Sequence, residues 1–235
     1  VKAAAELGIT VTFVPTYGTE AVAQHTFALI LELSNHIALH ADAVTAGQWR
    51  DYRKFCFWNT PLFELKGKTL GIIGYGRIGR ETAKIARAFN MNVIFYSHRD
   101  MGEQPDRQVD LDTLLKESDI VSLHCPLNGE TTGIINAENL KKMKSTAWLI
   151  NTARGPSVVD KDLADALNNG AIAGAGLDVC TKEPPEEDNP LLTAKNCIMT
   201  PHIAWAARET RERLISLAAD NLGSYLSGNP VNIAK

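Results

Sequence analysis

The sequence predicts an α/β protein built on a doubly wound parallel sheet. Three observations lead to this fold class. A short apolar strand runs directly into a glycine-rich turn and a helix at residues 69–89. Helix and strand patterns then alternate as far as residue 200. Polar or otherwise unusual residues stand immediately after several of the apolar strands, and ligands bind beyond the carboxyl ends of the strands in such sheets.

The stretch TLGIIGYGRIGRETAKIARAF contains the pattern GxGxxG. Residues 70–73 are apolar, as expected of a strand buried on both faces. In the turn, Gly74 allows a tight bend, Gly76 lets the backbone approach a pyrophosphate, and Gly79 lets the helix pack closely on the strand. A helix beginning near Arg77 would direct unpaired N–H groups at the turn, which suits a diphosphate. The strand, turn and helix together predict a Rossmann-type dinucleotide site.

Composition limits the other functions. The chain has 235 residues, 45% of them hydrophobic and 22% charged, and a net charge of −3. This balance favours a globular protein with no nucleic-acid or membrane partner. Cys56, Cys125, Cys180 and Cys197 are dispersed without a CxxC pair, so we expect buried thiols in a reducing cytoplasm. No metal-ligand spacing is present, and we expect no metal.

The N-terminal region is expected to contain the end of a helix followed by a strand at residues 10–15. One long helix is predicted for residues 19–47, with apolar residues at helical spacing. Residues 49–63, WRDYRKFCFWNTPLF, are rich in aromatic side chains without a clear period. They form either a loop folded back on its own domain or an arm packed against a second subunit, because exposed aromatic side chains favour association.

The second strand is predicted at residues 92–96. The residues that follow it determine which of the two nicotinamide cofactors binds. An acidic residue there would bind the adenosine ribose of NAD. Ser97 stands 21 residues after Gly76, where that acid is expected, and Arg99 could bind a 2′-phosphate with two hydrogen bonds. The pattern therefore favours NADP, while Asp100 keeps NAD possible. A solvated surface loop is the alternative for the segment containing His98.

The rest of the chain alternates between helices and strands. Helices are predicted at 111–117, 137–143 and 160–168, and strands at 119–123, 146–150, 171–177 and 197–200.

Four strand ends carry candidate ligand-binding residues. His124 is expected to form a wall of the nucleotide pocket, together with Cys125 and Pro126. Asp178 is either a structural acid or one near the nicotinamide. Arg154 and His202 each follow an apolar strand directly, so we expect both to lie over the same crevice.

The chain resembles the D-isomer-specific 2-hydroxyacid dehydrogenases over essentially its whole length. The motifs that carry the resemblance are GIIGYGRIG (71–79), HCPL (124–127), LINTARGPSVVD (149–160), GAGLDVCTKEPP (174–185) and NCIMTPHIAW (196–205). Within the family, AVAQHTFALILEL (21–33) and FWNTPLFELKGKTLGIIG (57–74) are most similar to glycerate dehydrogenases, also called hydroxypyruvate reductases. The resemblance implies hydride transfer between NAD(P)H and a small 2-keto or 2-hydroxy acid.

The resemblance also implies roles for individual residues. Arg154 would hold the substrate's carboxylate and carbonyl oxygen, His202 would be the acid/base, and Glu183 would orient the imidazole and favour its charged form. By itself, Glu183 would be read as a turn residue ahead of Pro184. The expected cofactor-binding residues are Gly74, Gly76, Arg77, Ile78, Gly79, Ser97, His98, Arg99, His124, Cys125, Pro126, Thr131, Thr152, Ala153, Arg154, Asp178, His202 and Ala204.

The resemblance finally implies a domain plan. Residues 1–16 are expected to be a remnant of a smaller substrate domain, residues 17–206 a dinucleotide-binding domain, and residues 207–235 a helix that returns to the smaller domain. The long helix and arm within residues 17–65 would form a homodimer interface. Because most of the family's N-terminal domain is missing, the alternatives are a binding fragment with little turnover, or a nucleotide-sensing interaction protein.

Overall fold

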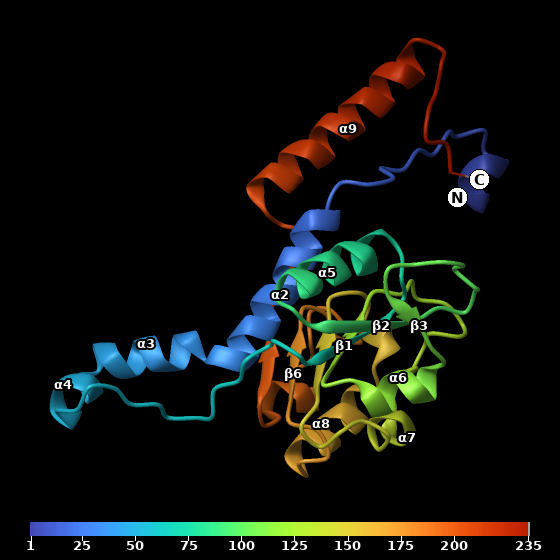
Figure 1. The fold of residues 1–235 in the computed structure, drawn as a ribbon. Helices are drawn as coiled ribbons and strands as arrows, with labels where there is room; N and C mark the ends of the chain where they lie inside the picture. The colour runs from blue at the N-terminus through green and yellow to red at the C-terminus, as the bar shows by residue number, and fades with distance from the viewer. Residues whose placement is uncertain (235) are drawn as a thin grey trace.

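The computed structural model describes residues 1–234, and its body is a seven-stranded parallel sheet with the strand order β3-β2-β1-β4-β5-β6-β7 (Figure 1). The strands are β1 (Thr69–Ile73), β2 (Asn92–Tyr96), β3 (Arg107–Gln108), β4 (Ile120–Leu123), β5 (Trp148–Asn151), β6 (Gly174–Leu177) and β7 (Cys197–Met199). The order reverses between β1 and β4, which confirms the doubly wound sheet and places a crevice at that point.

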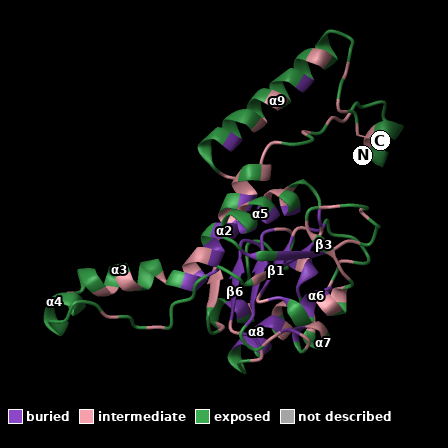
Figure 2. Cartoon of the chain, viewed as in Figure 1, coloured by how far each residue is buried: buried purple, intermediate pink, exposed green. Residues whose placement is uncertain are grey.

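Helices cover both faces of this sheet (Figure 1). The α-helices are α1 (Lys2–Glu6), α2 (Thr19–Asn35), α3 (Ile37–Thr45), α4 (Gln48–Tyr52), α5 (Arg77–Ala88), α6 (Leu111–Glu117), α7 (Ala137–Leu140), α8 (Asp160–Asn168) and α9 (Arg208–Leu226). Side chains of α2 and α5 join one hydrophobic cluster against the sheet, and side chains of α6, α7 and α8 join the other. The buried residues concentrate between these layers (Figure 2).

The apolar strand ahead of the glycine turn lies at the centre of the sheet, as predicted. Leu70 and Ile72 are fully buried, and β1 pairs with both β2 and β4. Asp119 supports the entry to this strand, because its carboxylate accepts a hydrogen bond of 2.8 Å from the backbone N–H of Thr69. The position of β1 fixes where the glycine turn emerges.

Two predictions for the N-terminal region are wrong. The expected helix over 19–47 is two helices, because His36 has a left-handed backbone (φ 46°) between α2 and α3. The Asn35 amide bonds the Leu31 carbonyl and the Ser34 hydroxyl, and such side-chain competition weakens a helix end. In place of a strand at residues 10–15 there is one bridge, from Thr12 to Ile233.

Smaller differences concern the sheet and the thiols. The short strand β3 was not predicted, since two residues carry no periodic signal. Strands β5 and β6 begin later than expected, at Trp148 and Gly174. Cys125 and Cys180 are buried, but Cys56 is exposed and contradicts the expectation of a buried thiol, because the arm that carries it leaves the body of the protein.

Two segments project from the sheet body (Figures 1 and 2). Helices α3 and α4 with the chain up to Phe63 form an arm, in which Phe55 is 92% and Trp58 66% exposed. The arm is extended, which excludes the interpretation of residues 49–63 as a loop folded back on its own domain.

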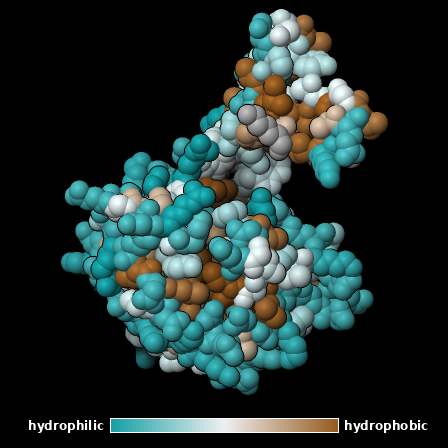
Figure 3. Space-filling view, turned by 90° about the vertical axis from the view of Figure 1, so that its right-hand side faces the viewer, coloured by the Kyte–Doolittle hydropathy of each residue, from teal (hydrophilic) through white to brown (hydrophobic). Residues whose placement is uncertain are grey.

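The second projection joins the two ends of the chain. Asn221 of α9 donates its side-chain N–H to the Phe13 carbonyl (3.0 Å), and Arg213 donates to the Tyr17 carbonyl (2.8 Å). Hydrophobic side chains gather on the surface of this unit (Figure 3), including Leu7 and Leu226. The domain boundaries stated above stay a prediction. Within residues 1–234, no helix is both long and apolar enough to cross a membrane.

Candidate active site

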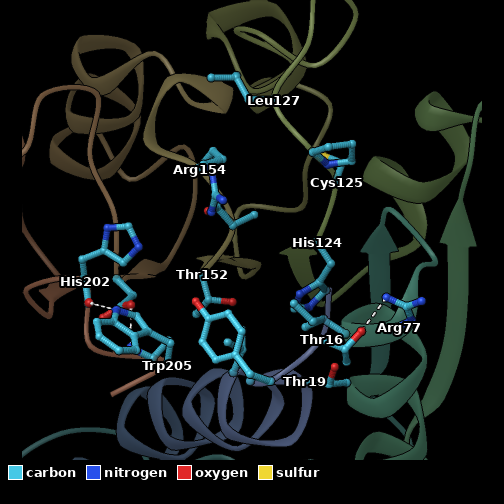
Figure 4. A pocket seen from close by; sticks show the side chains of 18 of the residues that line it. Thr16, Thr19, Arg77, His124, Cys125, Leu127, Thr152, Arg154, His202 and Trp205 are labelled. Carbon is cyan, nitrogen blue, oxygen red and sulfur yellow. Dashed lines mark hydrogen bonds between the residues drawn. The ribbon is translucent and has the colours of Figure 1, made fainter. Parts of the chain in front are cut away.

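A cavity of about 750 Å³ opens at the carboxyl ends of the strands (Figure 4). The predicted site residues that line it are Arg77, Ile78, His124, Cys125, Pro126, Thr152, Ala153, Arg154, Asp178, His202 and Ala204. A second chamber of about 240 Å³ adjoins it. This one is lined by the predicted residues Gly74, Gly76, Ser97, His98, Arg99 and Thr131, and it shares His124, Cys125 and Pro126 with the first. Gly79 and Glu183 lie outside both chambers.

The glycine turn has the geometry that a pyrophosphate requires. Gly74 has φ 97°, and a Cβ there would lie 2.5 Å from the Cys125 backbone nitrogen. A Cβ on Gly79 would lie 2.3 Å from the Gly74 carbonyl oxygen, so this residue is needed for packing. At Gly76 a Cβ would meet nothing within 4 Å. Helix α5 starts at Arg77 without a side-chain cap, so its first N–H groups face open space and can bind an anion.

The second chamber lies at the end of β2. Arg99 donates its Nε–H to His98 Nε2 (3.1 Å) and its backbone N–H to Ser97 Oγ (3.3 Å). The Asp100 carboxylate accepts a hydrogen bond of 2.9 Å from the Gly102 N–H and does not line the chamber. Ser97, His98 and Arg99 face the chamber at this strand end together with Met101, and Glu130 lines the chamber as well. Arg99 is thus the charged group at this strand end that could bind a 2′-phosphate.

His124 forms a wall common to both chambers. Its Nε2 lies 2.9 Å from Ser122 Oγ, whereas its buried Nδ1 has no hydrogen-bond partner within residues 1–234. Burial lowers the pKa of His124 to about 3, which keeps the ring neutral near pH 7. A buried polar atom without a partner is unfavourable, so this nitrogen marks a place where a bound molecule could supply one.

His202 is held by an unusual backbone and by a carboxylate. Its φ is 53°, and its N–H donates to the carbonyls of Asp178 (2.9 Å) and Thr200 (3.0 Å). The ring Nδ1 lies 2.6 Å from Glu183 Oε2, so Nδ1–H donates to that carboxylate. Nε2 is left for a substrate, and 43% of the side chain is exposed. The structure thus joins two residues separated by a turn and a strand, as the resemblance implied.

Asp178 organises the loop that carries this histidine. It is 1% exposed and accepts hydrogen bonds from the Thr200 hydroxyl (2.6 Å) and from the backbone N–H groups of Ile203 (2.9 Å) and Ala204 (2.8 Å). Of the two interpretations of Asp178, this geometry favours the structural one. Its carboxylate stabilises the left-handed turn at His202.

Arg154 emerges from a turn that is fixed on both sides. The Asn151 amide donates to the Arg154 carbonyl (2.9 Å) and accepts from the Ala153 N–H (3.0 Å). A Cβ on Gly155 would lie only 1.8 Å from the Cys180 carbonyl oxygen, so only glycine fits there. The Arg154 guanidinium makes one hydrogen bond within residues 1–234, to the Ala153 carbonyl, and leaves its remaining donors available. Arg154 and His202 border the same open space (Figure 4).

Other lining residues were not predicted. Thr16, the last residue of the expected remnant, and Tyr17, the first of the expected dinucleotide-binding domain, close the cavity from the N-terminal segment. Arg77 binds Thr16 Oγ1 (2.8 Å) and ties this segment to the glycine turn (Figure 4). Trp205 packs edge-on against Tyr17, with ring centroids 6.4 Å apart, and donates to the His202 carbonyl (3.0 Å). Trp205 ends the motif NCIMTPHIAW, which was the available signal.

The sequence matches the family model "D-isomer specific 2-hydroxyacid dehydrogenase, NAD binding domain" over residues 27–204. A hydroxypyruvate reductase of Blautia hydrogenotrophica is 50% identical, over 99% of this chain and 73% of the relative. A glycerate dehydrogenase of Methylorubrum extorquens is 42% identical, over 100% of this chain and 74% of the relative.

Solved structures of similar proteins point to the same family. One is an NADPH-dependent glyoxylate/hydroxypyruvate reductase from Sinorhizobium meliloti in complex with NADP and malonate, with a TM-score of 0.88 and 31% identity over 99% of this chain and 72% of that chain. A glyoxylate reductase from Paecilomyes thermophila has a TM-score of 0.86 and 35% identity over 99% of this chain and 70% of that chain. The family resemblance and the fold class are confirmed. The chain belongs to the D-isomer specific 2-hydroxyacid dehydrogenase family of oxidoreductases, and residues 27–204 match its NAD-binding domain.

Proposed function

We propose that this protein reduces small 2-keto acids with NAD(P)H, and that hydroxypyruvate and glyoxylate are its substrates, giving D-glycerate and glycolate. The observation that carries the proposal is that His202 lines the same cavity as Arg154, while its Nδ1 lies 2.6 Å from Glu183 Oε2. The names of the relatives, hydroxypyruvate reductase, glycerate dehydrogenase and glyoxylate reductase, support the substrate class. They do not favour a binding fragment or a nucleotide-sensing interaction protein.

Arg154 binds the carboxylate and the carbonyl oxygen of the keto acid, because its free donors form a planar fork. When bound, the nicotinamide supplies a hydride to the carbonyl carbon. His202 Nε2 gives its proton to the carbonyl oxygen, so that the 2-keto acid becomes a 2-hydroxy acid. Glu183 holds Nδ1 and stabilises the imidazolium before the proton is transferred. In the oxidation direction, His202 accepts the proton.

We propose NADP(H) as the preferred cofactor, with its pyrophosphate at the start of α5 and its 2′-phosphate at Ser97 and Arg99. The support is that Asp100, the acid that kept NAD possible, is bonded to the Gly102 N–H and does not line the chamber. A solved relative is an NADPH-dependent glyoxylate/hydroxypyruvate reductase, and its structure contains NADP.

We further propose a homodimer in the cytoplasm. The exposed aromatic side chains of the arm, Phe55 and Trp58 among them, and the exposed Ile37 of α3 support a subunit interface. The four unpaired cysteines support a reducing compartment. Light scattering on the purified protein should give twice the mass of one chain, and a monomer at micromolar concentration would contradict the dimer.

The reductase proposal is tested by following NADPH oxidation with hydroxypyruvate, glyoxylate and pyruvate, and NADP reduction with D- and L-glycerate. We expect oxidation with the first two acids and reaction with the D-isomer alone. The variant His202→Asn should slow both reactions about 10²–10⁴-fold. His36→Asn is its matched control, because His36 also has a left-handed backbone, which asparagine tolerates, and lies outside both chambers. Absence of reaction with every keto acid, or turnover that His202→Asn leaves undiminished, would contradict the proposal.

A further inference from the structure

One side-chain amide holds the loop that follows β2. Gln108 lies on β3, opposite Phe95 of β2, and is half-buried. Its Nε2 donates to the carbonyls of Ser97 (3.2 Å) and Arg99 (2.7 Å), and its Oε1 accepts from the Met101 N–H (3.0 Å). Two acceptors on one side and a donor on the other fix the orientation of the amide. Both of its donors and its acceptor are thus used on this one loop.

The far end of the same loop is attached to the glycine turn. The Asp106 carboxylate, with its side chain 4% exposed, accepts a hydrogen bond from the Tyr75 hydroxyl and pairs with Arg87 of α5. Tyr75 is the residue between the first two glycines of GxGxxG, and its ring stacks on Phe95 with centroids 3.9 Å apart. The loop is therefore held at its end by Asp106 and near its start by Gln108.

Between these two anchors, the residues that face the second chamber have few contacts of their own. Arg99 is exposed, and within residues 1–234 its side chain makes one hydrogen bond, to His98, and no ion pair. A long side chain with one weak contact is placed mainly by its backbone. The carbonyl of Arg99 makes the shortest of the Gln108 contacts, 2.7 Å. The position of the guanidinium consequently depends on Gln108.

We propose that Gln108 is a specificity-positioning residue: it holds residues 97–101 in the shape in which Ser97 and Arg99 accept the 2′-phosphate of NADP(H). This inference rests on the proposed function, since it assumes that the second chamber takes the adenosine end of the cofactor. Gln108 acts through the loop and lines neither chamber. NADH, which lacks the 2′-phosphate, does not depend on Arg99 and should be little affected.

The test compares dissociation constants of NADPH and NADH in the purified protein and its variants. Gln108→Met removes all three hydrogen bonds at similar volume without adding charge. We expect it to raise the NADPH constant about tenfold and the NADH constant by less than about twofold. Gln108→Glu keeps only the acceptor for the Met101 N–H. It should therefore raise the NADPH dissociation constant at least as much as Gln108→Met does. At saturating NADPH, kcat with hydroxypyruvate should stay unchanged.

Gln104→Met is the matched control, because the Gln104 amide also bonds this loop, at the Met101 carbonyl (2.8 Å), but not at Ser97 or Arg99. It should change either constant by less than about twofold. Equal weakening of both nucleotides in Gln108→Met, or no change in either, overturns the positioning role. So does a wild-type protein that binds NADH as tightly as NADPH. A wild-type protein that binds neither dinucleotide instead overturns the proposed function itself.

Discussion

The two ends of the cleft are built in different ways. At the proposed catalytic end, a cavity of about 750 Å³, buried contacts fix the backbone of the candidate reactive residues: the buried Asp178 carboxylate binds two consecutive N–H groups after His202, and Gly155 lets the Arg154 turn pack against Cys180. At the proposed adenosine end, a chamber of about 240 Å³, the half-buried Gln108 holds an exposed loop. A site fixed by buried contacts suits chemistry that requires precise geometry, whereas an exposed loop allows cofactor choice to change without disturbing that geometry.

This contrast predicts that changes at one end leave the other unaffected. The largest effect should come from His202→Asn, which removes the proton donor at the catalytic end. We expect kcat for hydroxypyruvate reduction to fall about 10²–10⁴-fold while the NADPH dissociation constant stays within about twofold. Steady-state kinetics together with calorimetric NADPH titration measure both quantities. His36→Asn should leave both quantities unchanged. Loss of NADPH binding in His202→Asn would show that the two ends are not independent.

Arg154→Lys should have the next largest effect, because lysine keeps the charge but loses the planar fork. We expect kcat/KM for hydroxypyruvate to fall about 100-fold, with NADPH binding unchanged. Arg208→Lys, on the exposed surface of α9, is the control and should behave as wild type. An Arg154→Lys enzyme with undiminished kcat/KM would show that another residue binds the substrate carboxylate.

Arg99→Met tests the adenosine end in the same manner. Loss of charge-assisted hydrogen bonds to the 2′-phosphate should raise the NADPH dissociation constant about 30-fold and leave that of NADH within about twofold. Arg107→Met removes a neighbouring charge that is paired with Glu117, and it should change neither constant. The chamber would not be the 2′-phosphate site if Arg99→Met weakened both nucleotides alike.

A further prediction concerns the stability of the fold at His124, the wall that both ends share. Its pKa is about 3 in the folded protein and about 6.5 in the unfolded chain, so between these values the unfolded chain binds a proton that the folded protein does not. Stability should therefore fall as the pH falls from about 6.5 towards 3, by at most about 1.4 kcal/mol per pH unit from this residue. When the free energy of unfolding is measured with urea at a series of pH values, His124→Gln should reduce its dependence on pH between about 6.5 and 3. His36→Asn should leave that dependence unchanged.

The difference between the ends also explains what could be predicted from sequence. Strand ends could be located from apolar runs, so the positions of Arg154, Asp178 and His202 over one crevice could be expected before the structure was known. The roles of Arg154 and Glu183 came from the family resemblance, because nothing local distinguishes Glu183 from a turn residue. Only the structure shows that its carboxylate reaches Nδ1 of His202.

The features that were missed depend on contacts distant in sequence. No pattern links Gln108 to Ser97, because the contact exists only once the two-residue strand β3 pairs with β2. The break at His36 depends equally on tertiary structure: α3 contains no buried residue, so no core holds it in line with α2. The apolar spacing continued across the break and therefore predicted one helix.

We propose that the Arg99 end selects the nucleotide and that the His202 end performs the reduction. The most direct test is a double-mutant cycle of Arg99→Met and His202→Asn, in which the NADPH dissociation constant and the single-turnover rate of NADPH oxidation by hydroxypyruvate are measured for all four proteins. We expect that Arg99→Met changes only binding, that His202→Asn changes only the rate, and that the double variant is additive within about 0.5 kcal/mol. A single-turnover rate in saturating NADPH that falls as far with Arg99→Met as with His202→Asn would contradict the proposal.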